Sequence, residues 1–324
     1  MGGEGGVSGP SHGGPDAAGV PRWDFSTNAN ACGPAPRVLL SIRQADATRY
    51  PDPAYTALRE QLAGFHAVPA ERIVIAASAS EFIGRMTLAV AQRWPQASVH
   101  LPQPGYADYG RAARTCGLRL AQAGDALLVW HTEPGSPDGR SQRVPATREG
   151  AVLVVDRAYA PLRLEGEAPA MPPQAWQLMS PNKALGLTGV RGAYAIAPPD
   201  AGELQMALER LAPSWPVGAH GVAMLAGWAL AETQAWLAEC LPTLRDWKRQ
   251  QLACCAELGW SCAESVTPFF MVNGFDASWL PRLREQGVKL RDTTDMGLPG
   301  HVRLSVQSPQ AQQALRAAWK KVTP

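Results

Sequence analysis

Short apolar runs alternate with helix-like segments through the first two-thirds of the chain. The runs at residues 73–77, 126–130, 151–155 and 192–198 hold hydrophobic or small residues with almost no polar alternation. Such runs are typical of parallel strands that are covered on both faces. Segments between them, such as 80–94, repeat their apolar residues at helical spacing. The pattern predicts an α/β fold with a mainly parallel central sheet.

The pattern changes from about residue 202 onward. A long helical stretch is followed by strand-like and helix-like segments in turn, and Ser308 is a candidate N-cap for the last helix. The first residues are rich in Gly, Ser and Pro, which predicts a flexible arm. We therefore expect an arm over residues 1–24, a large domain over 25–212 and a smaller C-terminal α+β domain over 213–324.

Composition narrows the possible functions. Hydrophobic residues make up 46% of 324 residues and the net charge is +2, which is too balanced to indicate a nucleic-acid or membrane partner. The six cysteines form no C-x-x-C pair, the histidines show no metal-ligand spacing, and no apolar run approaches the ~20 residues of a membrane span. Without a signal peptide, these features predict a cytoplasmic protein with reduced thiols and no metal site.

Lysine is unusually scarce. The chain has five lysines, and Lys183 is the only one that precedes Lys248. Arginine serves as the cation elsewhere, so a retained lysine indicates chemistry that a guanidinium cannot do, such as forming a Schiff base. The alternative is an ordinary surface lysine in an arginine-rich chain.

Several polar residues directly follow predicted strands. Ser78, Ala79 and Ser80 open a helix, where free backbone N–H groups can bind an anion. Asp156 ends an apolar strand, and Tyr159 follows three residues later. Because ligands bind at the carboxyl ends of strands in such sheets, these positions are candidates for one site. Taken singly, an ordinary helix cap or a loop salt bridge also explains each of them.

The order of these residues resembles that of a known superfamily. An anion site, an aromatic residue, Asp-x-x-Tyr and Ser-x-x-Lys-x7-Arg succeed one another, as in fold-type I pyridoxal-phosphate (PLP) enzymes. Within that superfamily the chain is similar to the histidinol-phosphate aminotransferase group. Four stretches further resemble its threonine-phosphate decarboxylase branch, which serves cobalamin biosynthesis: HGG at 12–14, FSTNANACGP at 25–34, RYPDPAYTALREQLA at 49–63 and SPDGR at 136–140.

The resemblance implies a PLP site in the large domain. Lys183 would hold the cofactor covalently and move protons, Asp156 would pair with the ring nitrogen, and Tyr159 would bond the ring's phenolic oxygen. Tyr106 would stack on the ring. The implied ligands of the cofactor phosphate are Ser78, Ala79, Ser80, Ser180, Asn182 and Arg191.

The resemblance also implies a partner subunit and a substrate. Tyr50 matches a tyrosine that reaches the phosphate of the neighbouring subunit, which implies a homodimer with sites at the interface. Arg303 matches the arginine that receives the substrate carboxylate, and Asn28 is a further candidate for contact with the substrate. Ser136 departs from the family pattern, because it stands where an asparagine usually bonds the ring oxygen.

The function expected from the resemblance is decarboxylation of L-threonine O-3-phosphate to (R)-1-amino-2-propanol phosphate. The alternative is an aminotransferase of the histidinol-phosphate type. The two reactions differ in which bond of the substrate lies perpendicular to the cofactor ring, and the sequence does not define that angle. A PLP-binding protein with weak catalysis is a third hypothesis, because Ser136 and the neighbouring loops differ from the pattern.

Overall fold

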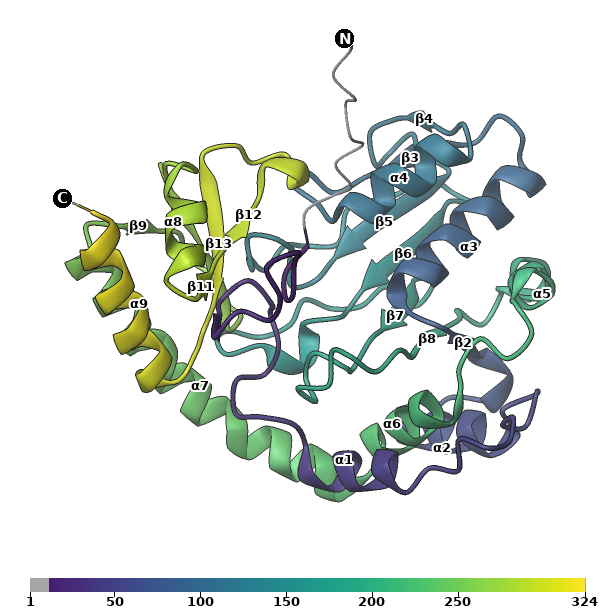
Figure 1. Ribbon diagram of the computed structural model, residues 1–324. Coiled ribbons are helices and arrows are strands. Elements are labelled where there is room, and N and C mark those ends of the chain that lie inside the picture. The colour runs from purple at the N-terminus through teal and green to yellow at the C-terminus, as the bar shows by residue number, and fades with distance from the viewer. Residues whose placement is uncertain (1–11, 324) are drawn as a thin grey trace, which may run out of the picture.

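A seven-stranded sheet forms the centre of the molecule. The computed structural model describes residues 12–323. The strands are β2 (Ile73–Ala76), β3 (Ser98–His100), β4 (Arg119–Leu120), β5 (Leu128–Thr132), β6 (Val152–Asp156), β7 (Trp176–Met179) and β8 (Ala193–Ile196). Their spatial order is β2-β8-β7-β6-β5-β3-β4 (Figure 1).

The sheet is mainly parallel, as predicted, with one exception. Strand β8 runs antiparallel to both of its neighbours, β2 and β7, and the other pairs are parallel. The expectation that the run at 192–198 is a parallel strand is therefore wrong. A buried run indicates that both faces are covered but carries no information on direction.

Helices cover both faces of this sheet (Figure 1). They are α1 (Pro36–Arg43), α2 (Thr56–His66), α3 (Ala79–Arg93), α4 (Ala107–Thr115), α5 (Gly202–Leu211) and α6 (Ala219–Trp228), with single 3₁₀ turns at Ala70–Arg72 and Ala160–Leu162. Successive side chains of a strand point to opposite faces. Ile73 and Ile75 of β2 pack in the cluster with α1, α2 and α6, whereas Val74 and Ala76 pack in the cluster with α3, α4 and α5.

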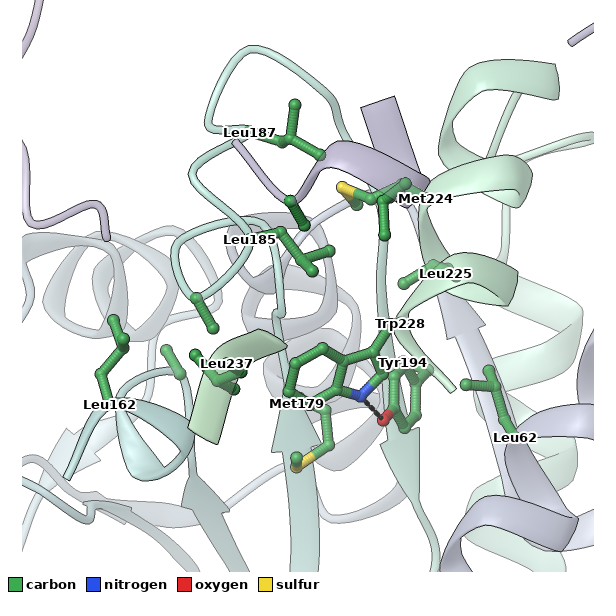
Figure 2. Close-up of a cluster of buried hydrophobic side chains, with 14 of the residues drawn as sticks. Leu62, Leu162, Met179, Leu185, Leu187, Tyr194, Met224, Leu225, Trp228 and Leu237 are labelled. Atoms are coloured by element: carbon green, nitrogen blue, oxygen red, sulfur yellow. Dashed lines mark hydrogen bonds between the residues drawn. The ribbon is translucent and has the colours of Figure 1, made fainter. Parts of the chain in front are cut away.

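The first of these clusters contains a buried aromatic pair. Figure 2 shows Trp228 of α6 beside Tyr194 of β8, where Trp228 Nε1 donates a hydrogen bond to the Tyr194 hydroxyl at 3.1 Å. The bond satisfies two polar groups in an otherwise apolar layer. It also ties α6 to the antiparallel strand.

The C-terminal part builds a second, antiparallel sheet. Its strands are β9 (Ser261–Cys262), β10 (Phe269–Asn273), β12 (Arg291–Asp292) and β13 (His301–Ser305), in the order β12-β13-β10-β9. The helices α8 (Trp279–Glu285) and α9 (Pro309–Val322) pack with it, and a 3₁₀ turn covers Thr294–Met296. The predicted N-cap of α9 is confirmed, because Ser308 Oγ accepts a bond from the Ala311 N–H.

Two segments link the sheets. Helix α7 (Ala231–Glu257) contributes Leu237 to the core of the large sheet and Cys255 to the C-terminal core. Strand β1 (Trp23–Asp24) pairs in parallel with β11 (Val288–Lys289), so the N-terminal segment lies against the C-terminal part (Figure 1). We propose that residues 12–24, assigned to the arm, accompany the small domain. The boundary after residue 212 stays a prediction.

Among residues 12–323, no helix is both long enough and apolar enough to cross a bilayer.

Candidate active site

One cavity of about 250 Å³ brings together nearly all of the predicted site residues. It lies at the carboxyl ends of strands β2, β5, β6 and β7 and is closed by the N-terminal segment and the C-terminal sheet. The predicted residues that line it are Asn28, Ser78, Ala79, Ser80, Tyr106, Ser136, Asp156, Tyr159, Ser180, Asn182, Lys183, Arg191 and Arg303. The residues that follow the predicted strands thus meet at one cavity, as the strand-end rule led us to expect.

The start of helix α3 forms the candidate anion site. Ser78 is the N-cap, and its Oγ accepts a hydrogen bond from the Glu81 N–H at 3.1 Å. The Glu81 carboxylate in turn accepts a bond at 3.1 Å from the N–H of Ala77, the residue before the N-cap. The N–H groups of Ala79 and Ser80, in the first turn, have no carbonyl partner within the helix. The backbone, rather than the Ser78 hydroxyl, is thus available to an anion.

Asp156 is the last residue of β6 and is only 7% exposed. Its carboxylate accepts hydrogen bonds from the Tyr109 hydroxyl at 2.8 Å and from the Ala158 N–H at 2.9 Å. Burial raises the pKa of Asp156, and the Tyr109 bond and the charge of Lys183 oppose that rise. A buried carboxylate gains most from a cationic partner, and the protonated nitrogen of a pyridine ring is one.

Lys183 and Tyr159 lie side by side in the cavity. The Lys183 Nζ is 5.1 Å from the centre of the Tyr159 ring. The Tyr159 hydroxyl accepts a long hydrogen bond of 3.4 Å from Asn28 Nδ2. On the other side, the Tyr106 hydroxyl and Ser80 Oγ are 3.1 Å apart, and burial raises the pKa of Tyr106 to about 12. The Tyr106 phenol therefore stays protonated at neutral pH.

The loop that carries Lys183 is held by the N-terminal segment. The Asn30 N–H donates to the Lys183 carbonyl at 2.9 Å, and Asn30 Nδ2 donates to the Ala184 carbonyl at 3.1 Å. At Gly186, where φ is +67°, an added Cβ would come within 2.6 Å of the Gly33 carbonyl oxygen. The close approach therefore requires glycine. Asn30 is a positioning residue that the sequence did not reveal.

Two buried arginines form the opposite wall. Arg303 of β13 and Arg291 of β12 are paired across the strands and are 6% and 3% exposed. Arg291 Nη2 forms a salt bridge with Asp295 and contacts both of its carboxylate oxygens, at 2.9 and 3.0 Å. Arg303 Nη2 donates to the Ser26 carbonyl at 3.2 Å. The sequence predicted Arg303 and missed Arg291, which lies in the two-residue strand β12.

Several polar atoms that line this cavity are buried without a partner. Within residues 12–323, no hydrogen-bond partner is present for Asn28 Oδ1, Ser180 Oγ, Arg291 Nη1 or Arg303 Nε. Native proteins rarely leave buried polar groups unpaired, so these atoms indicate a polar ligand. A lysine, a buried carboxylate, free N–H groups at a helix start and these unpaired donors fit PLP, which carries an aldehyde, a pyridine nitrogen and a phosphate.

Two predicted residues need separate description. Ser136 is buried in the loop after β5 and lines the cavity, as its position in the motif implied. Tyr50 lies outside the cavity and is 76% exposed, stacked on Trp215 with ring centres 4.2 Å apart. The structure of the single chain therefore brings Ser136 to the site and leaves Tyr50 at the surface.

Known proteins resemble this chain over most of its length. Residues 118–318 match the family model for aminotransferase class I and II. A histidinol-phosphate aminotransferase of Rhodospirillum rubrum is 31% identical over 92% of this chain and 89% of that protein. One of Halorubrum lacusprofundi is 28% identical over 87% of this chain and 83% of that protein.

Solved structures share the fold. The histidinol-phosphate aminotransferase of Sinorhizobium meliloti, in complex with PLP, superposes with a TM-score of 0.74 at 24% identity, over 91% of this chain and 89% of that one. The L-threonine-O-3-phosphate decarboxylase of Porphyromonas gingivalis gives 0.76 at 20% identity, over 92% and 98%.

These matches, with the cavity and its lysine, define a PLP-dependent enzyme of fold type I. The chain belongs to the aminotransferase class I and II family. The predicted superfamily, fold and cofactor are thereby confirmed. The prediction of decarboxylation is not confirmed, because the two relatives named above are histidinol-phosphate aminotransferases.

Proposed function

We propose that this protein is an aminotransferase of the histidinol-phosphate type that acts on a small phosphorylated amine. The observation that carries the proposal is the pair of buried arginines, Arg291 and Arg303, with unpaired N–H groups in the same cavity as Lys183. The names of the relatives found by sequence support the same reaction type.

The large-sheet wall holds the cofactor in this proposal. Lys183 anchors it, and Asp156 keeps the ring nitrogen protonated through charge. Tyr159 and Ser136 hydrogen-bond the phenolic oxygen of the ring, and Tyr106 packs against the ring. The proposed ligands of the cofactor phosphate are Ser78, Ala79, Ser80, Ser180, Asn182 and Arg191.

The chemistry then needs one mobile proton. Bound PLP withdraws electrons from the substrate carbon that carries the amine. Lys183 Nζ would accept the proton of that carbon and later return it. Asn28 lies 3.4 Å from the Tyr159 hydroxyl and faces the space where the substrate would sit. The buried wall around Lys183 limits proton exchange with water.

The two arginines suit both partners of a transaminase. Histidinol phosphate carries a phosphate and no carboxylate, whereas the keto acid that regenerates the cofactor carries carboxylates. Guanidinium groups bind both anions in bidentate fashion. Arg303, with its free Nε, is the proposed main anion ligand, and Arg291, held by Asp295, is the second.

Tyr50 supports a homodimer in the proposal. Its ring is exposed and held flat by Trp215, whose Nε1 donates to the Pro51 carbonyl at 3.1 Å. A tyrosine presented in this way is available to the cofactor phosphate of a second subunit.

The six cysteines are all unpaired, which agrees with the proposed cytoplasmic location.

Decarboxylation of L-threonine O-3-phosphate is the second candidate. One observation favours it: His12 and Gly13, from the stretch that resembles the decarboxylase branch, line the cavity. The same two arginines would then hold the carboxylate and the phosphate of one substrate.

A single incubation separates the candidates. Purified, PLP-loaded protein is mixed with L-histidinol phosphate or L-threonine O-3-phosphate, with and without 2-oxoglutarate, and glutamate and CO₂ are followed. We expect glutamate from histidinol phosphate only when 2-oxoglutarate is present, and no CO₂. Release of CO₂ from threonine phosphate without the keto acid would replace the proposal with decarboxylation. Neither product, with the cofactor spectrum intact, would reject both phosphorylated substrates.

A further inference from the structure

The N-terminal segment supplies a piece of the cavity wall. His12 and Gly13 line the cavity, and the chain then makes a tight turn at Asp16–Gly19. In that turn the Gly19 N–H donates to the Asp16 carbonyl at 2.8 Å, and the Asp16 N–H donates to the Gly19 carbonyl at 3.2 Å. Gly13 lies three residues before Asp16, so contacts that hold the turn also position the cavity wall.

Two cations of the C-terminal part hold the turn. Arg284 forms a bidentate salt bridge with Asp16, with Nε at 3.0 Å and Nη2 at 2.8 Å, and Lys289 Nζ lies 3.1 Å from the second carboxylate oxygen. The same cations reach the backbone of the segment. Arg284 Nη2 donates to the Gly19 carbonyl at 2.8 Å, and Lys289 Nζ donates to the Gly14 carbonyl at 2.6 Å.

This cluster differs from an ordinary surface ion pair. The side chains of Asp16, Arg284 and Lys289 are 32%, 19% and 14% exposed, so the two cations are largely sheltered from water. Hydrogen bonds from both lower the pKa of the Asp16 carboxyl, which is therefore charged at neutral pH. A bidentate geometry with a second cation fixes direction as well as distance, whereas isolated exposed pairs fix neither.

The far end of the segment touches the substrate wall. The Gly14 N–H donates to Ser26 Oγ at 2.9 Å, and an added Cβ at Gly13 would come within 2.4 Å of the Ser26 carbonyl oxygen. That carbonyl oxygen also accepts a bond from Arg303 Nη2. Contacts thus run without a break from Asp16 through Gly13 and Ser26 to Arg303.

We propose that Asp16 is a positioning residue for substrate binding. It does not line the cavity; by pairing with Arg284 and Lys289 it holds His12 and Gly13 against the same wall that carries Arg303. Loss of the carboxylate charge would let this wall move, while the cofactor wall on the large sheet would stay in place. The inference rests on the proposed function, because that function defines the substrate whose affinity is tuned.

The kinetic test compares Asp16→Asn with Asp46→Asn in the PLP-loaded enzyme. Asp46 is an exposed aspartate between α1 and α2 that bonds only its own turn, at Thr48, and approaches Arg49. We expect Asp16→Asn to raise KM for the phosphorylated substrate about tenfold, with kcat within about twofold and PLP affinity unchanged. Asp16→Glu, which keeps the charge, should recover part of the loss. Equal KM values in the Asn variant and the wild type would overturn the proposal.

A second measurement does not depend on turnover. Arg22 is exposed and lies between the turn and β1. Limited trypsin digestion of the holoenzyme should cleave after Arg22 faster in Asp16→Asn and in Arg284→Gln than in Asp46→Asn. If no substrate is turned over but this difference appears, the proposed function fails, whereas the proposal that Asp16 holds the N-terminal segment stands. Equal cleavage rates in all variants would overturn the proposal that Asp16 holds the N-terminal segment. If Asp16→Asn does not fold, Arg284→Gln supplies the readout.

Discussion

The two walls of the cavity are built by different routes. The wall on the large sheet consists of residues that directly follow strands, such as Asp156 after β6 and Ser180 after β7. The opposite wall joins segments from the two ends of the chain, where Ser26 and Arg303 are in contact although 277 residues separate them. One wall follows from a rule about parallel sheets, whereas the other depends on how the C-terminal sheet folds back.

The walls also differ in chemistry. The large-sheet wall offers one amine, one buried carboxylate and the free N–H groups of a helix start, a set that suits a cofactor. The opposite wall offers two buried guanidinium groups, which suit anionic substrates. Substitutions in the first wall should therefore change cofactor chemistry, and those in the second should change substrate affinity.

The largest effect is expected at Asp156. Asp156→Asn would remove the charge that, in the proposed function, balances the ring nitrogen in a buried site. Breaking a buried charge pair costs about 3–5 kcal/mol. We expect kcat to fall roughly 10²- to 10³-fold, while the protein still takes up PLP at Lys183. Steady-state rates and absorption spectra check this, with Asp246→Asn on α7 as the control. A variant with the wild-type kcat would remove Asp156 from the cofactor wall.

Arg303→Gln sharpens the comparison from the other side. It deletes hydrogen bonds to a charged group, each worth about 1.5–3 kcal/mol, so KM should rise roughly tenfold to a hundredfold. Arg291→Gln should raise KM less, because Arg291 Nη2 is already engaged with the Asp295 carboxylate. PLP affinity, measured by equilibrium titration of the apoenzyme, should stay unchanged in both. Weakened PLP binding with an unaltered KM would contradict the division between the walls.

Tyr109→Phe should give the smallest change and a characteristic pH signature. The Tyr109 hydroxyl lowers the pKa of Asp156, against the upward effect of burial. Without this bond the pKa of Asp156 rises, so the carboxylate is protonated at higher pH and the acid limb of kcat moves to higher pH. We expect about tenfold slower turnover at neutral pH. Tyr55→Phe, which removes another buried hydroxyl bond, to the Val217 carbonyl, should leave the pH profile unchanged.

Local patterns predicted much of the fold and of one wall. The apolar runs located four strands of the central sheet, and the Ser308 N-cap is present. The direction of β8 was wrong because strand direction depends on the connection rather than on the residues of the strand. Strand β7 was missed because Trp176–Met179 contains the polar Gln177 and so does not form an uninterrupted apolar run.

The missed site residues act through long-range pairing. Tyr109 becomes important only when α4 places its hydroxyl on Asp156, and Arg291 only when β12 pairs with β13. Asp16 depends on cations 268 and 273 residues further along the chain, Arg284 and Lys289. Spacing within a segment carries no information on such contacts. The family resemblance indicated Arg303 and Asn28 as candidate substrate contacts because it compares whole chains rather than single segments.

Covalent mapping of the cofactor tests the central claim most directly. The PLP-loaded protein is reduced with borohydride, digested and analysed by mass spectrometry, beside a Lys183→Arg variant that keeps the positive charge but cannot form the bond. We predict one modified peptide, carrying the cofactor on Lys183, and none from the variant. Cofactor fixed to another lysine, such as Lys248 or Lys289, or equal labelling of the Lys183→Arg variant, would contradict the account.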